Sequence, residues 1–147
     1  MSDPGADGFD RGFLIGLLVG EGSFGGDGKQ PQVTLRMHIR HEALFRWIME
    51  RYPRTKLYGP YTHGGRSYFQ WMARGSALVE DLLPLLEREI TPARDGHAAA
   101  RLGQMVENYA GFIARERRRL QLDAPARSSL AKEHGTADLR PDCGDSA

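Results

Sequence analysis

The feature that most restricts the fold is an unbroken alternation of polar and apolar residues between Gln32 and Arg40. The apolar positions of this segment are Val33, Leu35, Met37 and Ile39. Successive side chains of a strand point to opposite faces, so the pattern predicts a strand with one face in the core. The other face is predicted to present polar and basic side chains to solvent.

The segments around this strand alternate between helical and extended patterns. Helices are predicted from Phe9 to about Glu21, over 42–52, over 76–89 and over 93–120, the last interrupted near Gly111. Hairpins are predicted over 23–40, turning at Asp27-Gly28, and over 56–73, turning at His63-Gly64-Gly65. A helix, a hairpin, a helix, a second hairpin and further helices indicate a mixed α+β domain.

The chain of 147 residues is long enough for one domain with a buried core, which we place at residues 9–120. Residues 1–8 and 121–147 are polar and poor in bulky apolar side chains, and they are predicted to be disordered. Cys143 is the single cysteine, which excludes an internal disulfide and a zinc site built from cysteines. The longest apolar runs fall far short of a membrane span and the start of the chain lacks a secretory signal, so a cytoplasmic protein without a membrane partner is expected.

The formal net charge of +1 is an average over two unlike parts of the chain. Residues 29–74 contain nine Lys and Arg but only two acidic residues, Glu42 and Glu50. The rest of the chain is correspondingly acidic. This asymmetry is typical of a protein with a face that binds a polyanion.

A glycine-rich stretch, Gly20-Glu21-Gly22-Ser23-Phe24-Gly25, matches the spacing of nucleotide-binding loops. A dinucleotide fold needs a helix after these glycines, and residues 26–31 cannot begin one. A protein kinase would need further motifs and two lobes, which this chain lacks. Both nucleotide-binding interpretations are therefore disfavoured.

Three glycines, Gly12, Gly16 and Gly20, recur at intervals of four within the first predicted helix. A glycine inside a helix costs roughly 1 kcal/mol relative to alanine, so three in register indicate a use. One interpretation is the close approach of a second helix. The other is that the glycines accommodate a tight contact within the domain.

Residues 14–24 read LIGLLVGEGSF, which resembles the LAGLIDADG motif of homing endonucleases with its common GEGSF ending. The similarity extends over roughly residues 9–113 in the order of helices and hairpins. It implies an αββαββα fold with a four-stranded antiparallel saddle sheet, helices on one face, and double-stranded DNA against the other. Because the chain has one motif, it also implies a homodimer in which the motif helices pack together through Gly12, Gly16 and Gly20.

The resemblance further implies a site for metal-dependent cleavage of DNA, with Mg²⁺ or another divalent cation as cofactor. Glu21 matches the acidic metal ligand that ends the motif helix, and the Gly20 carbonyl would assist it. His41 and Arg94 fall near positions where the family places a polar residue that orients water and a basic residue beside the scissile phosphate. The chain departs from the motif at Val19, where an acid is usual, and at Ile15, where alanine is usual.

The predicted DNA-reading face combines the exposed positions of the two hairpins. Arg and Gln side chains can form paired hydrogen bonds with guanine and adenine, and Thr can contact bases or phosphate. The candidate residues are Gln32, Thr34, Arg36, His38, Arg40, Lys56, Tyr58, Arg66, Tyr68 and Gln70. Lys29 and Arg66 are candidates for backbone phosphate. His38 and His41 form an H-x-x-H pattern, but their side chains should diverge at the end of a strand, so no zinc site is expected.

Three interpretations remain open at this level. The first is a homodimeric, metal-dependent DNA endonuclease. The second is a module on the same fold that binds DNA or RNA without cleaving it, with a regulatory or splicing role. The third is an unrelated α+β protein with a coincidental motif.

Overall fold

The computed structural model describes residues 4–133, and the surroundings of side chains over residues 5–123. The first half contains α1 (Pro4–Glu21), β1 (Gly22–Gly26), β2 (Pro31–His38), the 3₁₀ turn η1 (Ile39–His41) and α2 (Glu42–Arg51). The second half contains β3 (Lys56–His63), β4 (Arg66–Arg74), α3 (Gly75–Ala77), the π-helical segment η2 (Leu78–Leu82), α4 (Leu83–Glu89), α5 (Gly96–Asn108) and α6 (Ala110–Glu133). The predicted α+β class is confirmed.

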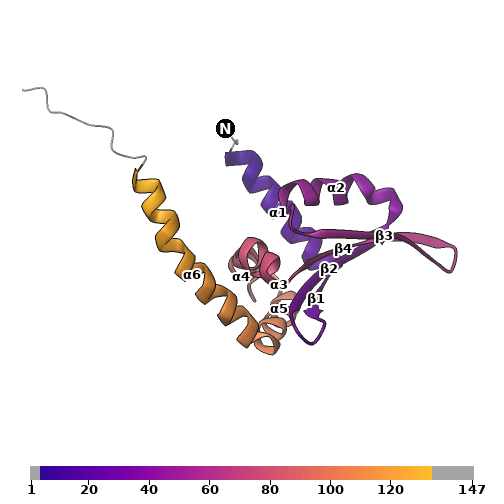
Figure 1. Cartoon of the computed structure of the whole chain (residues 1–147). Coiled ribbons are helices and arrows are strands. Elements are labelled where there is room, and N and C mark those ends of the chain that lie inside the picture. Colours follow the sequence, from indigo (N-terminus) through magenta and orange to yellow (C-terminus); the bar gives the residue numbers. More distant parts are fainter. Residues whose placement is uncertain (1–3, 134–147) are drawn as a thin grey trace, which may run out of the picture.

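The four strands form one antiparallel sheet in the order β1-β2-β4-β3. The strand with the alternating pattern, β2, is therefore central, and β1 and β3 are the edges. Helices α1 and α2 lie against one face of the sheet, and among the described elements no helix covers the opposite face (Figure 1). The sequence pattern and the topology agree on which face is buried.

The core lies between the covered face of the sheet and the helices. Val33 and Leu35 of β2 and Trp71 of β4 are fully buried there, together with apolar side chains of α1, α2, η2 and α4. Thr55 is the one buried polar residue in the described part of the chain. Its hydroxyl accepts a 2.8 Å hydrogen bond from the Trp71 indole N–H and donates one of 2.6 Å to the Tyr52 carbonyl. These bonds satisfy the polar groups at this point of the core.

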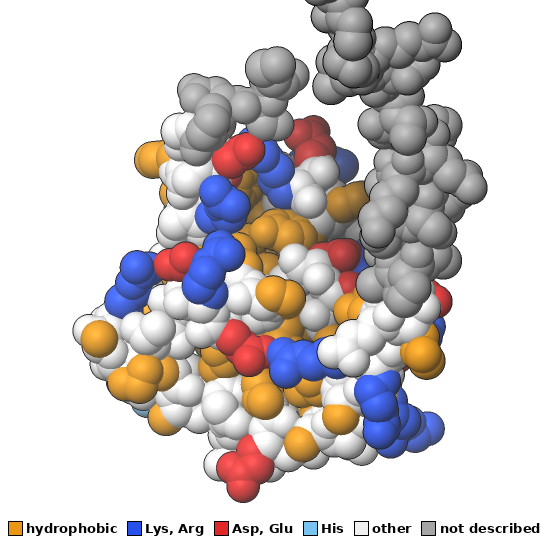
Figure 2. Space-filling model, turned by 90° about the vertical axis from the view of Figure 1, so that its left-hand side faces the viewer, with side chains coloured by type: hydrophobic (Ala, Val, Ile, Leu, Met, Phe, Trp, Pro, Cys, Tyr) orange, Lys and Arg blue, Asp and Glu red, His pale blue; other side chains and the backbone are white. Residues whose placement is uncertain are grey.

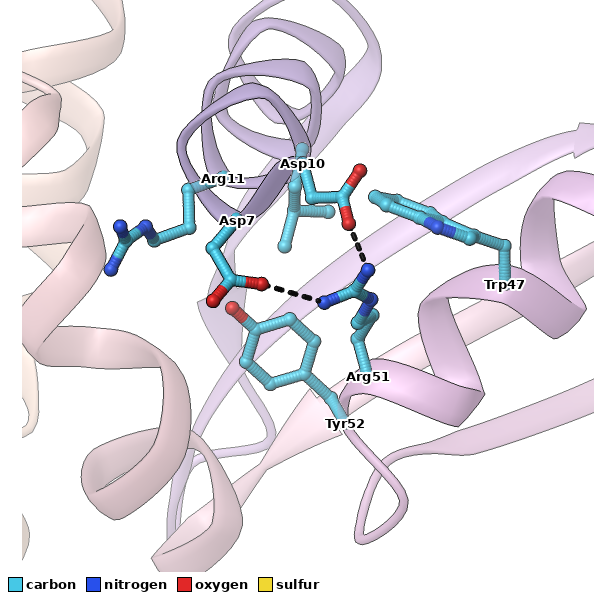
Figure 3. A pocket seen from close by; sticks show the side chains of 7 residues that line it. Asp7, Asp10, Arg11, Trp47, Arg51 and Tyr52 are labelled. Atoms are coloured by element: carbon cyan, nitrogen blue, oxygen red, sulfur yellow. Dashed lines mark hydrogen bonds and ion pairs between the residues drawn. The ribbon is translucent and has the colours of Figure 1, made fainter. Parts of the chain in front are cut away.

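The start of α1 differs from the sequence prediction. Helix α1 begins at Pro4 rather than at Phe9, so residues 4–8 are helical and Asp10 lies inside the helix. Instead, Asp10 and Asp7 both form ion pairs with Arg51 at the end of α2, as Figure 3 shows. These pairs tie the first turns of α1 to a helix that lies far along the sequence.

The predicted strand over 32–40 ends early, at His38. The His38 Nδ1 atom accepts a hydrogen bond of 3.0 Å from the Arg40 amide and so caps a 3₁₀ turn. As a result Ile39, predicted to be buried, is 38% exposed. The prediction that Arg40 lies on the strand face is wrong for the same reason.

The two hairpin turns use the predicted residues. The Asp27 carboxylate accepts hydrogen bonds of 2.9 Å from the amides of Lys29 and Gln30, and the bonds from Gln30 and then Lys29 hold the pKa of Asp27 below its usual value. Gly64 and Gly65 both have positive φ angles of 57° and 75° in the second turn. Two consecutive left-handed residues match the twist of an antiparallel hairpin, which explains the glycine pair.

Ion pairs hold the C-terminal helix to the domain. Arg119 pairs with Glu80 of η2 at 3.1 Å, and Arg117 pairs with Glu87 of α4. On the side of the molecule formed by α4 and α6, basic and acidic side chains lie next to one another around a group of hydrophobic side chains (Figure 2).

Helix α6 continues to Glu133, beyond the predicted domain end at residue 120. The remaining parts of the two segments predicted to be disordered, 1–3 and 134–147, lie outside the described residues.

Candidate nucleic-acid interface

The uncovered face of the sheet is built from rows of side chains that cross the strands. Arg36 of β2 stands opposite Gln70 of β4, which stands opposite Tyr58 of β3. Directly opposite residues of antiparallel strands share a face, so each row projects from one side of the sheet. The flanking rows are Thr34, Met72 and Lys56 on one side and His38, Tyr68 and Tyr61 on the other. Gln32 of β2 and Arg66 of β4 lie further along the same strands and project from the same face. Nine of the ten predicted DNA-contacting residues therefore lie on the strands of one face, and Arg40 is the one that does not.

Tyr61 belongs to this face although the simple alternation of β3 excludes it. The register shifts between Tyr58 and Tyr61, where the bulge at Gly59-Pro60 inserts an extra residue into β3. A bulge of this kind reverses the parity of the residues that follow it. The ring of Tyr61 accordingly lies 5.6 Å from that of Tyr68, centroid to centroid. The signal was present in the sequence, since Gly and Pro inside a strand are typical of a bulge.

The basic residues of the chain differ in whether they form ion pairs. Seven arginines away from the open sheet face form ion pairs, for example Arg46 with Glu42 and Arg54 with Glu80 and Asp81, whereas Arg11, Arg101, Arg115 and Arg118 form none with a described residue. Basic residues on or beside the open sheet face form no ion pair with any described residue: Lys29, Arg36, Arg40, Lys56, Arg66 and Arg74. The positive charge of this face is therefore available to an external polyanion.

Arg36 is held by two neutral neighbours rather than by an acid. Its Nη2 atom donates a 3.0 Å hydrogen bond to the Gln70 Oε1 atom, and its guanidinium carbon lies 4.9 Å from the centre of the Tyr68 ring. Arg36 and Tyr68, together with His38, Arg40 and Arg66, line an open hollow of about 510 Å³ whose wall contains no acidic residue.

A second uncovered surface lies along α1. The side chains of Leu14, Ile15 and Leu18 are buried on one side of this helix. The other side carries Gly12, Gly16 and Gly20, and a Cβ atom added to any of these glycines would meet nothing within 4 Å. The glycines therefore do not serve a tight contact within the described domain.

Two aromatic side chains accompany these glycines at the N-terminal half of α1. Phe9 is 71% exposed and Phe13 is 44% exposed, and their rings stack at 6.2 Å. Phe13 also meets Trp47 of α2 edge to face. The outer face of α1 (Phe9, Gly12, Phe13, Gly16 and Gly20, called here the α1 face) is thus apolar, bulky near the N-terminus and smooth near Glu21.

Glu21 ends α1 at the edge of the sheet. The next residue, Gly22, opens β1 and stands opposite Leu35, the neighbour of Arg36. The Glu21 side chain is exposed and has no hydrogen bond or ion pair with the described residues. The Gly20 carbonyl lies in the last turn of the helix, where carbonyls lack a helical partner. Both groups offer oxygen atoms of the kind that ligate a hard cation.

The two other predicted catalytic residues lie in different places. His41 is half-buried at the junction of η1 and α2, at the end of the sheet where β2 finishes and β1 begins, which is also the end that holds Glu21. It occupies the N-cap position of α2 without a capping side-chain hydrogen bond.

Arg94 is not brought to this end. It forms an ion pair of 2.7 Å with Glu89 and lines an open pocket of about 460 Å³ together with Gly8, Arg11 and Gly12. These residues precede Glu21 by roughly 14–20 Å along the helix axis at 1.5 Å per residue. Arg94 was expected beside a phosphate held at Glu21. Within one chain, it lies instead next to the opposite half of α1.

Among the described residues no three His, Cys, Asp or Glu side chains gather into a group able to hold a metal ion. A metal held by Glu21 would therefore need ligands from outside the chain. In the part of the chain that the structure describes, no helix has the length and apolar character needed to cross a membrane.

No protein-family model and no curated protein matches this chain. Among solved structures, it is similar to the group I intron-encoded homing endonuclease I-CeuI complexed with DNA, with a TM-score of 0.47 and 14% identity over 69% of this chain and 55% of that one. It is similar to a mutant of I-SmaMI, with a TM-score of 0.48 and 12% identity over 69% of this chain and 44% of that one. For the homing endonuclease I-TnaI the TM-score is 0.44, with 14% identity over 76% of this chain and 95% of that one. The chain spans about half the length of the first two.

Proposed function

We propose that two copies of this chain associate through the α1 face and cleave double-stranded DNA at a specific site, in the manner of a single-motif LAGLIDADG endonuclease. The observation that carries the proposal is that two uncovered surfaces, the α1 face and the open face of the sheet, meet at Glu21. The α1 face runs down to Glu21, and the unneutralised basic face of the sheet begins beside it.

The shape of the α1 face favours a pairing that is closest near the acid. Gly16 and Gly20 allow two helix backbones to approach, whereas Phe9 and Phe13 hold the N-terminal halves further apart. A two-fold axis along this contact places the two Glu21 carboxylates near each other. It also sets the two sheets side by side, which makes a continuous basic surface across a duplex.

The donor groups fit a hard divalent cation. The Glu21 carboxylate and the Gly20 carbonyl are oxygen ligands of the type that Mg²⁺ prefers, and Mg²⁺ takes few ligands from protein. One carboxylate is too few for a site within one chain, so the second Glu21 and phosphate oxygens would complete it. When bound, such a cation polarises the phosphate and supplies an activated water. Glu21 would hold the cation and the sheet would hold the duplex, with His41 placed to orient water at the same end.

A cleavage assay on a library of duplex DNA tests the proposal. The purified chain is expected to cut a subset of sequences with Mg²⁺ and none in EDTA, and to elute as a dimer by light scattering. Glu21→Gln removes a charged oxygen with little change of shape, so cutting should be abolished and binding kept. Glu50→Gln, an exposed acid on α2 away from the site, is the matched control and should cut normally.

Two results would contradict parts of this function. A chain that binds a specific duplex but does not cut it with any divalent cation is a binding module on this fold, not a nuclease. A strict monomer on DNA would exclude pairing through the α1 face.

A further inference from the structure

On the open face of the sheet, one cation is fixed in position before any ligand binds. The Arg36 guanidinium is fastened on one side by Gln70 and lies over the ring of Tyr68. Lys29, Arg40, Lys56, Arg66 and Arg74 have no such side-chain hydrogen bond among the described residues. A planar group held in this way loses little freedom on binding and presents its remaining N–H groups in a fixed direction.

The position of Arg36 distinguishes a base contact from a phosphate contact. It lies on a central strand, with Gln70 and Tyr58 extending its row toward one edge of the sheet. When a sheet lies in the major groove, its middle faces base edges and its rims face the backbones. The open hollow of about 510 Å³ beside Arg36 leaves room for a base edge to approach.

We propose that Arg36 reads a guanine, so that each half of the recognition site contains one guanine fixed by this residue. This inference rests on the proposed binding of duplex DNA and specifies its sequence. Guanine offers two acceptors, O6 and N7, to the fork of an arginine. Gln70 uses one N–H of the guanidinium, and enough donors remain for the paired contact.

The same contact gives Gln70 a different role from the one its residue type indicates. A glutamine that reads adenine needs both its oxygen and its nitrogen. The Gln70 oxygen already accepts from Arg36, which fixes the orientation of the amide and leaves one lone pair for any second donor. Gln70 is then a positioning residue for Arg36 rather than a base reader.

Selection of bound duplexes from a randomised library, in EDTA so that nothing is cut, tests this inference. The wild-type chain should enrich sites with an invariant guanine in each half. Arg36→Ala should erase the preference at that position only, with affinity for the guanine-containing site falling about 10- to 100-fold. Arg36→Lys keeps the charge but loses the planar fork held by Gln70 and Tyr68, and because an ammonium group can still donate to O6 and N7, it should weaken the preference less than Arg36→Ala does.

The positioning role has its own readout, the ratio of affinities for guanine and adenine at that position. Gln70→Ala should lower this ratio several-fold. Gln70→Glu retains an acceptor oxygen for Arg36 and should preserve the ratio even if total affinity falls. A merely structural role of Gln70 would leave the ratio unchanged in both variants.

Other outcomes separate this inference from the function on which it rests. If Arg36→Ala weakens all sequences equally and lowers the salt dependence, Arg36 holds phosphate and the inference is wrong, although DNA binding stands. If the wild-type chain enriches a site with the guanine but never cuts it with Mg²⁺, the inference stands and the endonuclease does not. If the wild-type chain enriches no sequence, both the guanine contact of Arg36 and the proposed site-specific endonuclease are wrong.

Discussion

The glycines of the α1 face give a prediction in which folding and association respond in opposite directions. Gly12 and Gly16 lie inside α1, and an added methyl group at either meets no atom of the same chain. Alanine is favoured over glycine inside a helix by about 0.8–1.0 kcal/mol per residue. The double variant Gly12→Ala, Gly16→Ala should therefore stabilise the isolated protomer by about 2 kcal/mol.

That gain is large enough to measure. About 2 kcal/mol changes the unfolding equilibrium constant roughly 30-fold and raises the melting temperature by about 4–8 °C for a chain of this size. The measurement is urea denaturation at concentrations low enough to keep the wild-type chain monomeric, because association itself adds stability that depends on concentration. The same variant should elute as a monomer at concentrations where the wild type is a dimer, and should no longer cleave DNA.

Gly22→Ala is the matched control from the same segment. A Cβ atom at Gly22 would lie 2.5 Å from the Leu18 carbonyl oxygen, and backbone cannot move away cheaply. This variant should destabilise the protomer. If instead the double variant destabilises the dilute protomer, the glycines pack within the domain; if it stabilises the protomer but still dimerises and cuts, the α1 face is not the interface.

Four further changes test the fold and the basic face. Thr55→Val leaves the Trp71 indole N–H buried without a partner and should cost about 1–3 kcal/mol of unfolding free energy in urea. Tyr109→Phe removes the acceptor of the hydrogen bond from the turn of the first hairpin and should lower the unfolding free energy, measured in the same way, by about 1 kcal/mol or less. The hydrogen bond from Arg88, and then the charge of Arg94, lower the pKa of Glu89 below 4.5. The stability that this carboxylate contributes should therefore be present above pH 4.5 and disappear as the pH falls through the lowered pKa. Glu89→Gln should remove that part of the acid dependence of the unfolding free energy, measured by urea titrations at several pH values. Lys29→Ala should reduce the slope of log affinity for duplex DNA against log salt by about 0.9 if this lysine neutralises one phosphate, and an unchanged slope would place Lys29 away from the duplex.

The alternation of polar and apolar residues was sufficient to predict which face of the sheet is buried, but not where its strands end. The alternation in β2 identified Val33 and Leu35 as core because a period of two is a property of the strand itself. It failed at Ile39 because His38 supplies a side-chain acceptor that turns the chain into a 3₁₀ turn. The end of a strand is decided by such single hydrogen bonds, which an alternation of polar and apolar residues does not reveal.

Ion pairs accompany two further differences between the sequence predictions and the structure. The first turns of α1 are helical where disorder was predicted, and Asp7 and Asp10 pair there with Arg51 of α2. Arg94 pairs with Glu89, five residues earlier in the chain, and lines a pocket with Gly8, Arg11 and Gly12 of α1 rather than lying beside Glu21. The pairs of Arg51 join segments more than 40 residues apart in the chain, and no local pattern encodes that proximity.

The distribution of ion pairs explains how a chain with a net charge of +1 can present a strongly basic surface. The acidic residues of η2 and α4 are paired with arginines outside the sheet, as Glu80 is with Arg54 and Arg119. Those arginines are already neutralised, so they would release few counterions from DNA and add little to its attraction. The cations of the open sheet face have no such partners among the described residues, and they act together on one side of the molecule. The total charge therefore underestimates the field at this face, and the field is set by how many unpaired cations the fold gathers there.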